Sequence, residues 1–112
     1  MVEDRKLPGN PIAFIQDCIT RGQILWTYHV NMRLAGRFIP REAIVASVGT
    51  YELVESYPDD KYLPSYLVLA QHESESFHVL FAADIDGDNV RVVTAYRPEP
   101  KDWDENLKNR KA

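Results

Sequence analysis

A histidine and two arginines stand at four-residue steps in the first third of the chain, as His29, Arg33 and Arg37. Four residues turn an α-helix by about 400°, so the three side chains fall along one stripe if this segment is helical. An imidazole can move a proton near neutral pH, and guanidinium groups can hold an anion through paired hydrogen bonds. The combination suits phosphate chemistry. The open alternative is a solvated helix face that begins with a histidine.

Cleavage of RNA by its own 2′-hydroxyl needs a base, an acid and positive donors around phosphorus. Three further residues near the end of the chain could join such a site. For His78 the plainer interpretation is a surface residue of a strand, and for Tyr96 a ring that closes the core with its hydroxyl at the edge. The candidate catalytic residues are His29, His78 and Tyr96, and the candidate substrate-binding residues are Arg33, Arg37 and Arg97.

The first helix has clear start and stop signals. Asparagine and proline at positions 10 and 11 are typical of a helix start, and Arg21-Gly22 is typical of a helix end. Between them, Ile12, Ile15 and Ile19 recur on one face, as in a helix packed on a core. Cys18 lies beside this stripe. We expect it to be a small buried residue rather than a nucleophile, because no basic neighbour is evident to lower its pKa.

Two more helices are expected before the middle of the chain. Residues 24–27 form a short extended piece, and Thr27 caps a second helix to about Arg37, which carries the histidine–arginine stripe on its flank. Pro40 opens a third helix that ends at Gly49. The residues expected to face inward on this third helix are Ile44, Val45 and Val48.

The second half predicts four strands joined by hairpins, with a two-residue turn at Asp86-Gly87. The fold class is therefore α+β, with N-terminal helices packed on one face of a roughly four-stranded antiparallel sheet. The predicted strands span residues 51–57, 65–72, 77–85 and 89–97.

The register of the last hairpin decides which polar residues meet. With the two-residue turn, Phe77 pairs with Tyr96 on an apolar face that helices cover, and Phe81 pairs with Val92 on the same face. His78 then lies on the open face, together with Arg97. An extra turn residue or a β-bulge would instead place His78 directly across from Tyr96.

Composition describes an ordinary globular chain. Its 112 residues predict a single domain over 1–112, with an ordered core of about 10–103 and a charged C-terminal tail that Trp103 anchors. No apolar run approaches the roughly 20 residues needed to cross a bilayer, and the N-terminus has no signal-peptide pattern, so we expect no membrane partner. One cysteine suits a reducing cytoplasm. A net charge of −4 argues against non-specific binding of long nucleic acids.

Metal and cofactor sites are not expected. The histidines and the cysteine show none of the short ligand spacings of zinc sites. Residues 84–88 resemble the start of a calcium loop, but the glycine is in the wrong place, so we interpret them as a hairpin turn. The sequence also has no glycine-rich phosphate loop. We expect the other acidic residues of the strands and loops to be solvated. Glu55 is the exception, and if it is buried its carboxylate would need a partner such as an arginine.

In combination, these residues resemble a family of small bacterial domains of unknown function, over about residues 20–103. Its pattern is His-x3-Arg-x3-Arg and an isoleucine, then Glu-x-Tyr-Pro with an aspartate, Pro-Ser-x-Leu, Leu-His-Val-Val and Thr-Ala-Tyr-x-Pro. Phe38 replaces a usual glycine and Phe77 a usual leucine, and neither change touches a candidate proton-transfer group. The matching residues are His29, Arg33, Arg37, Ile39, Glu55, Tyr57, Pro58, Asp59, Pro64, Ser65, Leu67, His78, Val79, Thr94, Ala95, Tyr96 and Pro98.

The resemblance implies a compact α+β fold akin to the RelE, MqsR and BrnT toxins, metal-independent RNA cleavage and an antitoxin protein as partner. It also implies that His29, Arg33, His78, Tyr96 and Arg97 form the site. The alternative is a non-catalytic protein-binding module or degenerate toxin, which the acidic balance favours and which would dock partners along an exposed edge strand such as residues 51–57. Pairing of the helix stripe with Glu55 or Asp59 would also favour this alternative.

Overall fold

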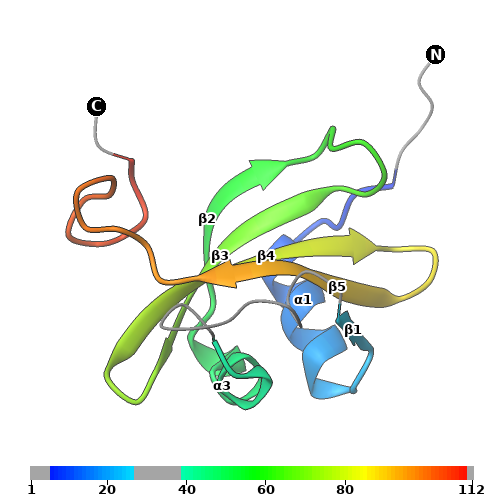
Figure 1. Ribbon diagram of the computed structural model, residues 1–112. Coiled ribbons are helices and arrows are strands. Elements are labelled where there is room, and N and C mark those ends of the chain that lie inside the picture. The colour runs from blue at the N-terminus through cyan, green and yellow to red at the C-terminus, as the bar shows by residue number, and fades with distance from the viewer. Residues whose placement is uncertain (1–5, 27–38, 111–112) are drawn as a thin grey trace.

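The computed structural model describes residues 6–26 and 39–110, in which two helices lie on one face of a five-stranded mixed sheet (Figure 1). The strands lie side by side in the order β1-β5-β4-β3-β2. The elements are α1 (Pro11–Thr20), β1 (Ile24–Trp26), α3 (Arg41–Ala46), a 3₁₀ turn η2 (Val48–Thr50), β2 (Glu52–Tyr57), β3 (Ser65–His72), β4 (Glu75–Asp84) and β5 (Asn89–Tyr96).

The α+β class is confirmed, and the four predicted strands are present within two residues at each end. The expectation of a sheet with four antiparallel strands is wrong, because β1 adds a fifth strand. It pairs in parallel with β5, with Ile24 opposite Val90 and Trp26 opposite Val92. A three-residue strand is too short to show an alternating pattern, and its parallel partner lies far along the chain.

The start and end of α1 are confirmed. The side chain of Asn10 accepts a hydrogen bond from the Ala13 N–H at 3.1 Å, and Gly22 follows the helix with a φ of +78°. The third helix starts after Pro40 as expected but ends early, at Ala46. The expectation that Val45 faces inward is wrong, because it is 40% exposed, whereas Ile44 is fully buried. Val48, in the 3₁₀ turn that follows, packs against the core as expected.

The core lies between the helices and one face of the sheet. Ile15 and Ile19 of α1 and Ile44 of α3 pack there, and the Tyr51 hydroxyl donates to the Ile44 carbonyl at 2.6 Å. The sheet contributes alternate residues of its central strands, as expected for a face covered by helices. These are Tyr66, Val68, Ala70, Phe77, Val79, Phe81, Ala83, Val90, Val92 and Ala95.

A β-bulge in β5 changes the register predicted for the last hairpin. Near the turn Phe81 pairs with Val92, as predicted. Between Leu80 and Phe81 the register shifts, so that His78 pairs with Tyr96. The predicted pairing of Phe77 with Tyr96 is therefore wrong, and the bulged alternative is confirmed. Tyr96 belongs to the open face of the sheet, away from the helices.

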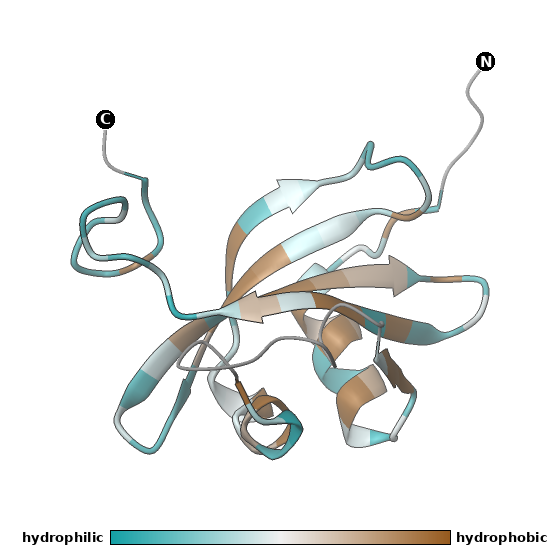
Figure 2. Cartoon of the chain, in the orientation of Figure 1, coloured by the Kyte–Doolittle hydropathy of each residue, from teal (hydrophilic) through white to brown (hydrophobic). Residues whose placement is uncertain are grey.

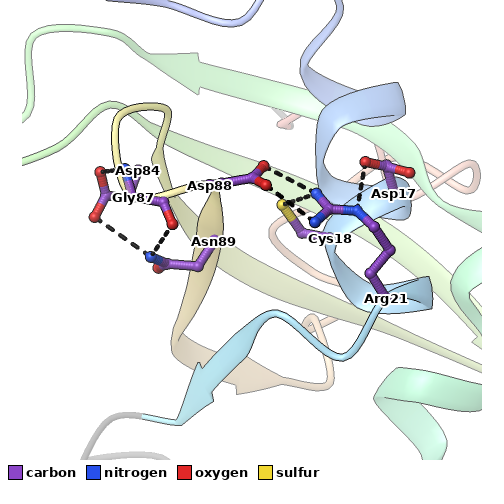
Figure 3. Close-up of polar contacts among 7 residues, drawn as sticks. All are labelled: Asp17, Cys18, Arg21, Asp84, Gly87, Asp88 and Asn89. Atoms are coloured by element: carbon purple, nitrogen blue, oxygen red, sulfur yellow. Dashed lines mark hydrogen bonds and ion pairs between the residues drawn. The ribbon is translucent and has the colours of Figure 1, made fainter.

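An arginine ties the end of α1 to the β4–β5 turn (Figure 3). The Arg21 guanidinium bonds to both carboxylate oxygens of Asp88 at 2.9 and 3.0 Å and to Asp17 at 2.9 Å. It also lies 3.8 Å from the sulfur of Cys18, a basic neighbour that the sequence had not revealed. Cys18 is nevertheless buried, and burial raises the pKa of its thiol, so its prediction as a small core residue is confirmed.

Within the described residues, no helix is long and apolar enough to cross a membrane.

Candidate functional site

The residues that sequence analysis singled out are only partly within the described structure. His29, Arg33 and Arg37, together with the helix predicted to carry them, lie outside the described residues. Their roles therefore stay predictions. His78, Tyr96 and Arg97 are described, and the first two lie against each other on the open face of the sheet.

His78 is fully buried, which makes its interpretation as a surface strand residue wrong. Its Nε2 lies 2.7 Å from the backbone oxygen of Leu107, and its Nδ1 lies 3.2 Å from the hydroxyl oxygen of Tyr96. A carbonyl oxygen can only accept, so Nε2 carries the hydrogen and donates it. In the neutral ring Nδ1 is then the acceptor, and the Tyr96 hydroxyl donates to it.

The burial of His78 comes from residues near the end of the chain. The ring of Trp103 stands edge-on to the imidazole, with 4.6 Å between ring centroids, and is itself 4% exposed. The predicted role of Trp103 as an anchor is thus confirmed. Alternation along β4 correctly placed His78 on the face without helices, but it gave no sign that a distant segment would cover that face.

Burial sets the protonation of this pair. It lowers the pKa of His78, because the charged imidazolium loses water, although the Leu107 carbonyl opposes the shift. It also raises the pKa of Tyr96, whose side chain is half-buried. Near neutral pH the pair therefore holds a neutral imidazole and a neutral phenol, with the phenol hydrogen directed at nitrogen.

A carboxylate completes the cluster from the edge strand β2. Glu55 accepts hydrogen bonds from the Tyr57 hydroxyl and from two nitrogens of Arg110, the latter at 2.8 and 3.1 Å. The Arg110 guanidinium holds the pKa of Glu55 below its usual range. The expectation of an arginine partner for Glu55 is confirmed. That this partner is Arg110, in the charged tail, had no sequence signal.

Arg97 does not join this cluster. Its guanidinium bonds to Glu75 at 2.8 Å, and it lines a shallow hollow with Pro40 and Glu42, on the helix side of the sheet. The predicted open-face position of Arg97 is wrong, because the bulge turns Tyr96 to that face and therefore turns the next residue away. A single site cannot use both His78 and Arg97.

The described part of the cluster can accept a proton and orient a phenol. No group of three His, Cys, Asp or Glu side chains that could hold a metal ion occurs among the described residues. Arg110 supplies positive charge to the cluster, but its guanidinium already forms an ion pair with Glu55. The predicted stripe at residues 29–37, outside the described residues, would supply further phosphate donors.

Residues 26–97 match the family model of a domain of unknown function, DUF4258. The chain belongs to this family. The DUF4258 match covers β2 to β5 and so includes His78, Tyr96 and Glu55, whereas the residues that cover them follow its end. Comparisons of the chain with curated proteins and with solved structures found no match.

Proposed function

We propose that this DUF4258 protein is a cytoplasmic, toxin-like endoribonuclease that needs no metal, has a RelE-like fold and works with an antitoxin partner. The observation that carries the proposal is the pairing of His78 with Tyr96 across the β5 bulge, beside the Glu55–Tyr57 pair. Bulges often re-aim side chains at functional sites. Here the bulge brings a proton acceptor and a phenol together on one face.

The direction of the hydrogen bond between Tyr96 and His78 assigns them a base role. The substrate 2′-hydroxyl gives its proton to the Tyr96 oxygen while Tyr96 passes its own proton to Nδ1 of His78. The imidazolium formed keeps its second hydrogen on Nε2. Because the Tyr96 hydroxyl already bonds to Nδ1, Tyr96 touches the substrate and His78 acts through it.

The other roles rest on the sequence. His29 protonates the leaving 5′-oxygen, and Arg33 and Arg37 hold the phosphate. We do not assign a phosphate role to Arg97, because it lies on the helix side of the sheet.

A groove further along the same face of the sheet offers room for nucleotides. It has a volume of about 360 Å³ and includes Ala82, Arg91 and Val93 of the open face. The ring of Tyr62 at its rim is 80% exposed, and Lys61 lies over that ring. Exposed aromatic rings beside cationic side chains are a common platform for unpaired bases. This groove supports a single-stranded RNA substrate.

The test is induced expression in a bacterial host of the wild type, His29→Ala, Tyr96→Phe and the control His72→Ala, with growth and total RNA followed together. His72 is a half-exposed histidine at the end of β3 that lines the hollow on the helix side of the sheet. We expect the wild type and the control to slow growth and fragment RNA, and the two site variants to do neither. Equal growth and intact RNA for all four proteins would contradict the proposal.

A purified sample tests the chemistry directly. With EDTA present, an RNA oligonucleotide should be cut to products with 2′,3′-cyclic phosphate ends, and Tyr96→Phe should slow this by about 10²-fold or more. Dependence on added Mg²⁺ would contradict a metal-independent reaction.

The second candidate is a non-catalytic protein-binding module. The buried His78, with both nitrogens bonded, and the ion-paired Glu55 favour it, because such groups can serve stability alone. Its docking site would be the edge strand β2. Under this alternative Tyr96→Phe leaves growth and RNA unchanged, whereas Ser56→Pro within β2 abolishes binding of the antitoxin-like partner.

A further inference from the structure

The last part of the chain lies across the candidate site, on the face of the sheet opposite α1 and α3 (Figure 1). We propose that residues 98–110, the C-terminal strap, are an autoinhibitory element that must leave the sheet before RNA can reach Tyr96. The inference rests on the proposed function, because it concerns access to that same site.

Contacts to two strands, β4 and β2, hold the strap over the site. Trp103 covers His78 of β4, which bonds to the Leu107 carbonyl. Arg110 bonds to Glu55 of β2 and stacks on the Trp103 ring, 4.6 Å from its centroid. A further ion pair joins Lys108 to Glu52 of β2 at 2.7 Å. Arg110 therefore connects the buried anchor to the edge strand and acts as a latch.

The backbone of the strap closes on itself. The Asp104 N–H donates to the Asn109 carbonyl and the Leu107 N–H to the Asp104 carbonyl, both at 2.8 Å, and Trp103 forms a β-bridge with Arg110. None of these bonds is made to the sheet, so none has to break for the strap to leave it. It can therefore move as a preformed unit, with less loss of backbone hydrogen bonding than a β-strand would suffer.

Several features make the strap easy to displace. Its ribbon is mostly hydrophilic (Figure 2), so apart from Trp103 it buries little apolar surface. Its ion pairs are partly exposed and therefore weak. Leu107 has a φ of +61°, a conformation that is strained for leucine, and its carbonyl is the one that holds His78.

The match to the DUF4258 family model separates the candidate site from the strap. It ends at residue 97, one residue before the strap. The residues of the proposed base thus belong to the DUF4258 domain, and the strap that covers them is an addition after it.

The deciding variant is Arg110→Ala in the full chain, because Arg110 is exposed and its loss should open the latch without unfolding the protein. The matched control is Arg41→Ala, which removes a guanidinium stacked on another tryptophan, 4.9 Å above Trp26. Trp103→Phe serves as a second strap variant that keeps an aromatic ring. Circular dichroism checks that each variant is folded.

Two measurements are made on each protein. The first is the rate at which diethyl pyrocarbonate modifies His78, located by mass spectrometry, with the partly exposed His72 as internal reference. The second is the rate of single-turnover cleavage of an RNA oligonucleotide in EDTA. We expect Arg110→Ala to raise both rates by about tenfold, since an exposed ion pair and a cation–π contact each contribute a factor of a few. Arg41→Ala should match the wild type.

The outcomes separate the two proposals. Faster modification of His78 without faster cleavage, in proteins that do cleave RNA, would overturn the strap and leave the ribonuclease standing. Faster modification of His78 with no RNA cleavage by any of the proteins would overturn the proposed ribonuclease activity. The proposed autoinhibition would fall with it, because there would be no activity to inhibit. Equal protection of His78 in the wild type and both strap variants would show that the strap does not open, and would overturn the inference.

Discussion

The imidazole of His78 is held neutral by its surroundings. Burial under Trp103 lowers its pKa from the ordinary value of 6.5, and the Leu107 carbonyl fixes the hydrogen on Nε2. The Tyr96 hydroxyl then has to donate to Nδ1. One buried ring therefore fixes the direction of a two-residue proton path, whether that path serves catalysis or stability alone.

This neutral state makes stability depend on pH. Below about pH 6.5 the unfolded chain binds a proton at His78 that the folded chain does not bind until a lower pH. The free energy of unfolding should be highest above that value and fall as the pH drops through it. We expect the free energy of unfolding, measured with urea, to fall less between pH 7.5 and pH 5.5 for His78→Gln than for the wild type.

The control for this experiment is His72→Gln, which removes an imidazole from the end of β3 and leaves the contacts of His78 in place. Glu55, whose pKa is lowered, contributes only in a more acidic window, where stability falls as the carboxylate is protonated. Equal losses for the wild type and His78→Gln would show that His78 is not held neutral.

At the scale of elements, the β4–β5 hairpin determines which residues meet. Its turn is closed by the Asp88 N–H, which donates to the Ile85 carbonyl at 3.2 Å, and the Gly87 N–H donates to the Asp84 side chain at 2.9 Å. Asp88 of the same turn binds Arg21, so the turn also positions α1. The bulge further along β5 then sets His78 against Tyr96.

Gly87→Ala should weaken this hairpin. A Cβ at this position would lie 2.5 Å from the Asp84 carboxylate oxygen, so that side chain would have to move and lose its bond to the turn. We expect the free energy of unfolding to fall by about 1 kcal/mol. The control is Gly49→Ala, where nothing lies within 4 Å of the added atom. Equal urea midpoints for the two variants would contradict the turn's role.

At the scale of the whole molecule, the sheet has two different covers. Helices pack on one face over a continuous apolar core, and the strap lies on the other through Trp103 and ion pairs. The second cover depends on far fewer buried groups, so it should open at a lower free energy than the core.

Hydrogen exchange should show this difference. The protected amides of the strap, including those of Asp104 and Leu107, should label faster than those of Val79 and Phe81 in β4 under native conditions. Once off the sheet, a short loop held only by its own few hydrogen bonds opens readily. Mass spectrometry after pulse labelling measures both regions at once. Exchange of strap and sheet at one common rate would mean that the strap leaves only when the whole domain unfolds.

Much of the fold could be predicted because its signals are local. Asn10-Pro11 and Gly22 bound α1, and alternation with the Asp86-Gly87 turn gives the hairpin strands, since capping, turn conformation and side-chain alternation act over a few residues. The cluster around His78 was predicted only in part, and its catalytic role stays a prediction. His78 and Tyr96 were found, and their pairing was one of two registers that the sequence allowed.

The sequence by itself therefore determined the α+β class, the hairpins, the buried Cys18 and the anchoring Trp103. Only the tertiary structure decided that β1 joins β5, that a bulge separates Tyr96 from the core, and that Arg110 reaches Glu55 across the open face. These contacts join residues distant in the chain. Their free energy depends on the packing of the whole sheet, which no local pattern of residues records.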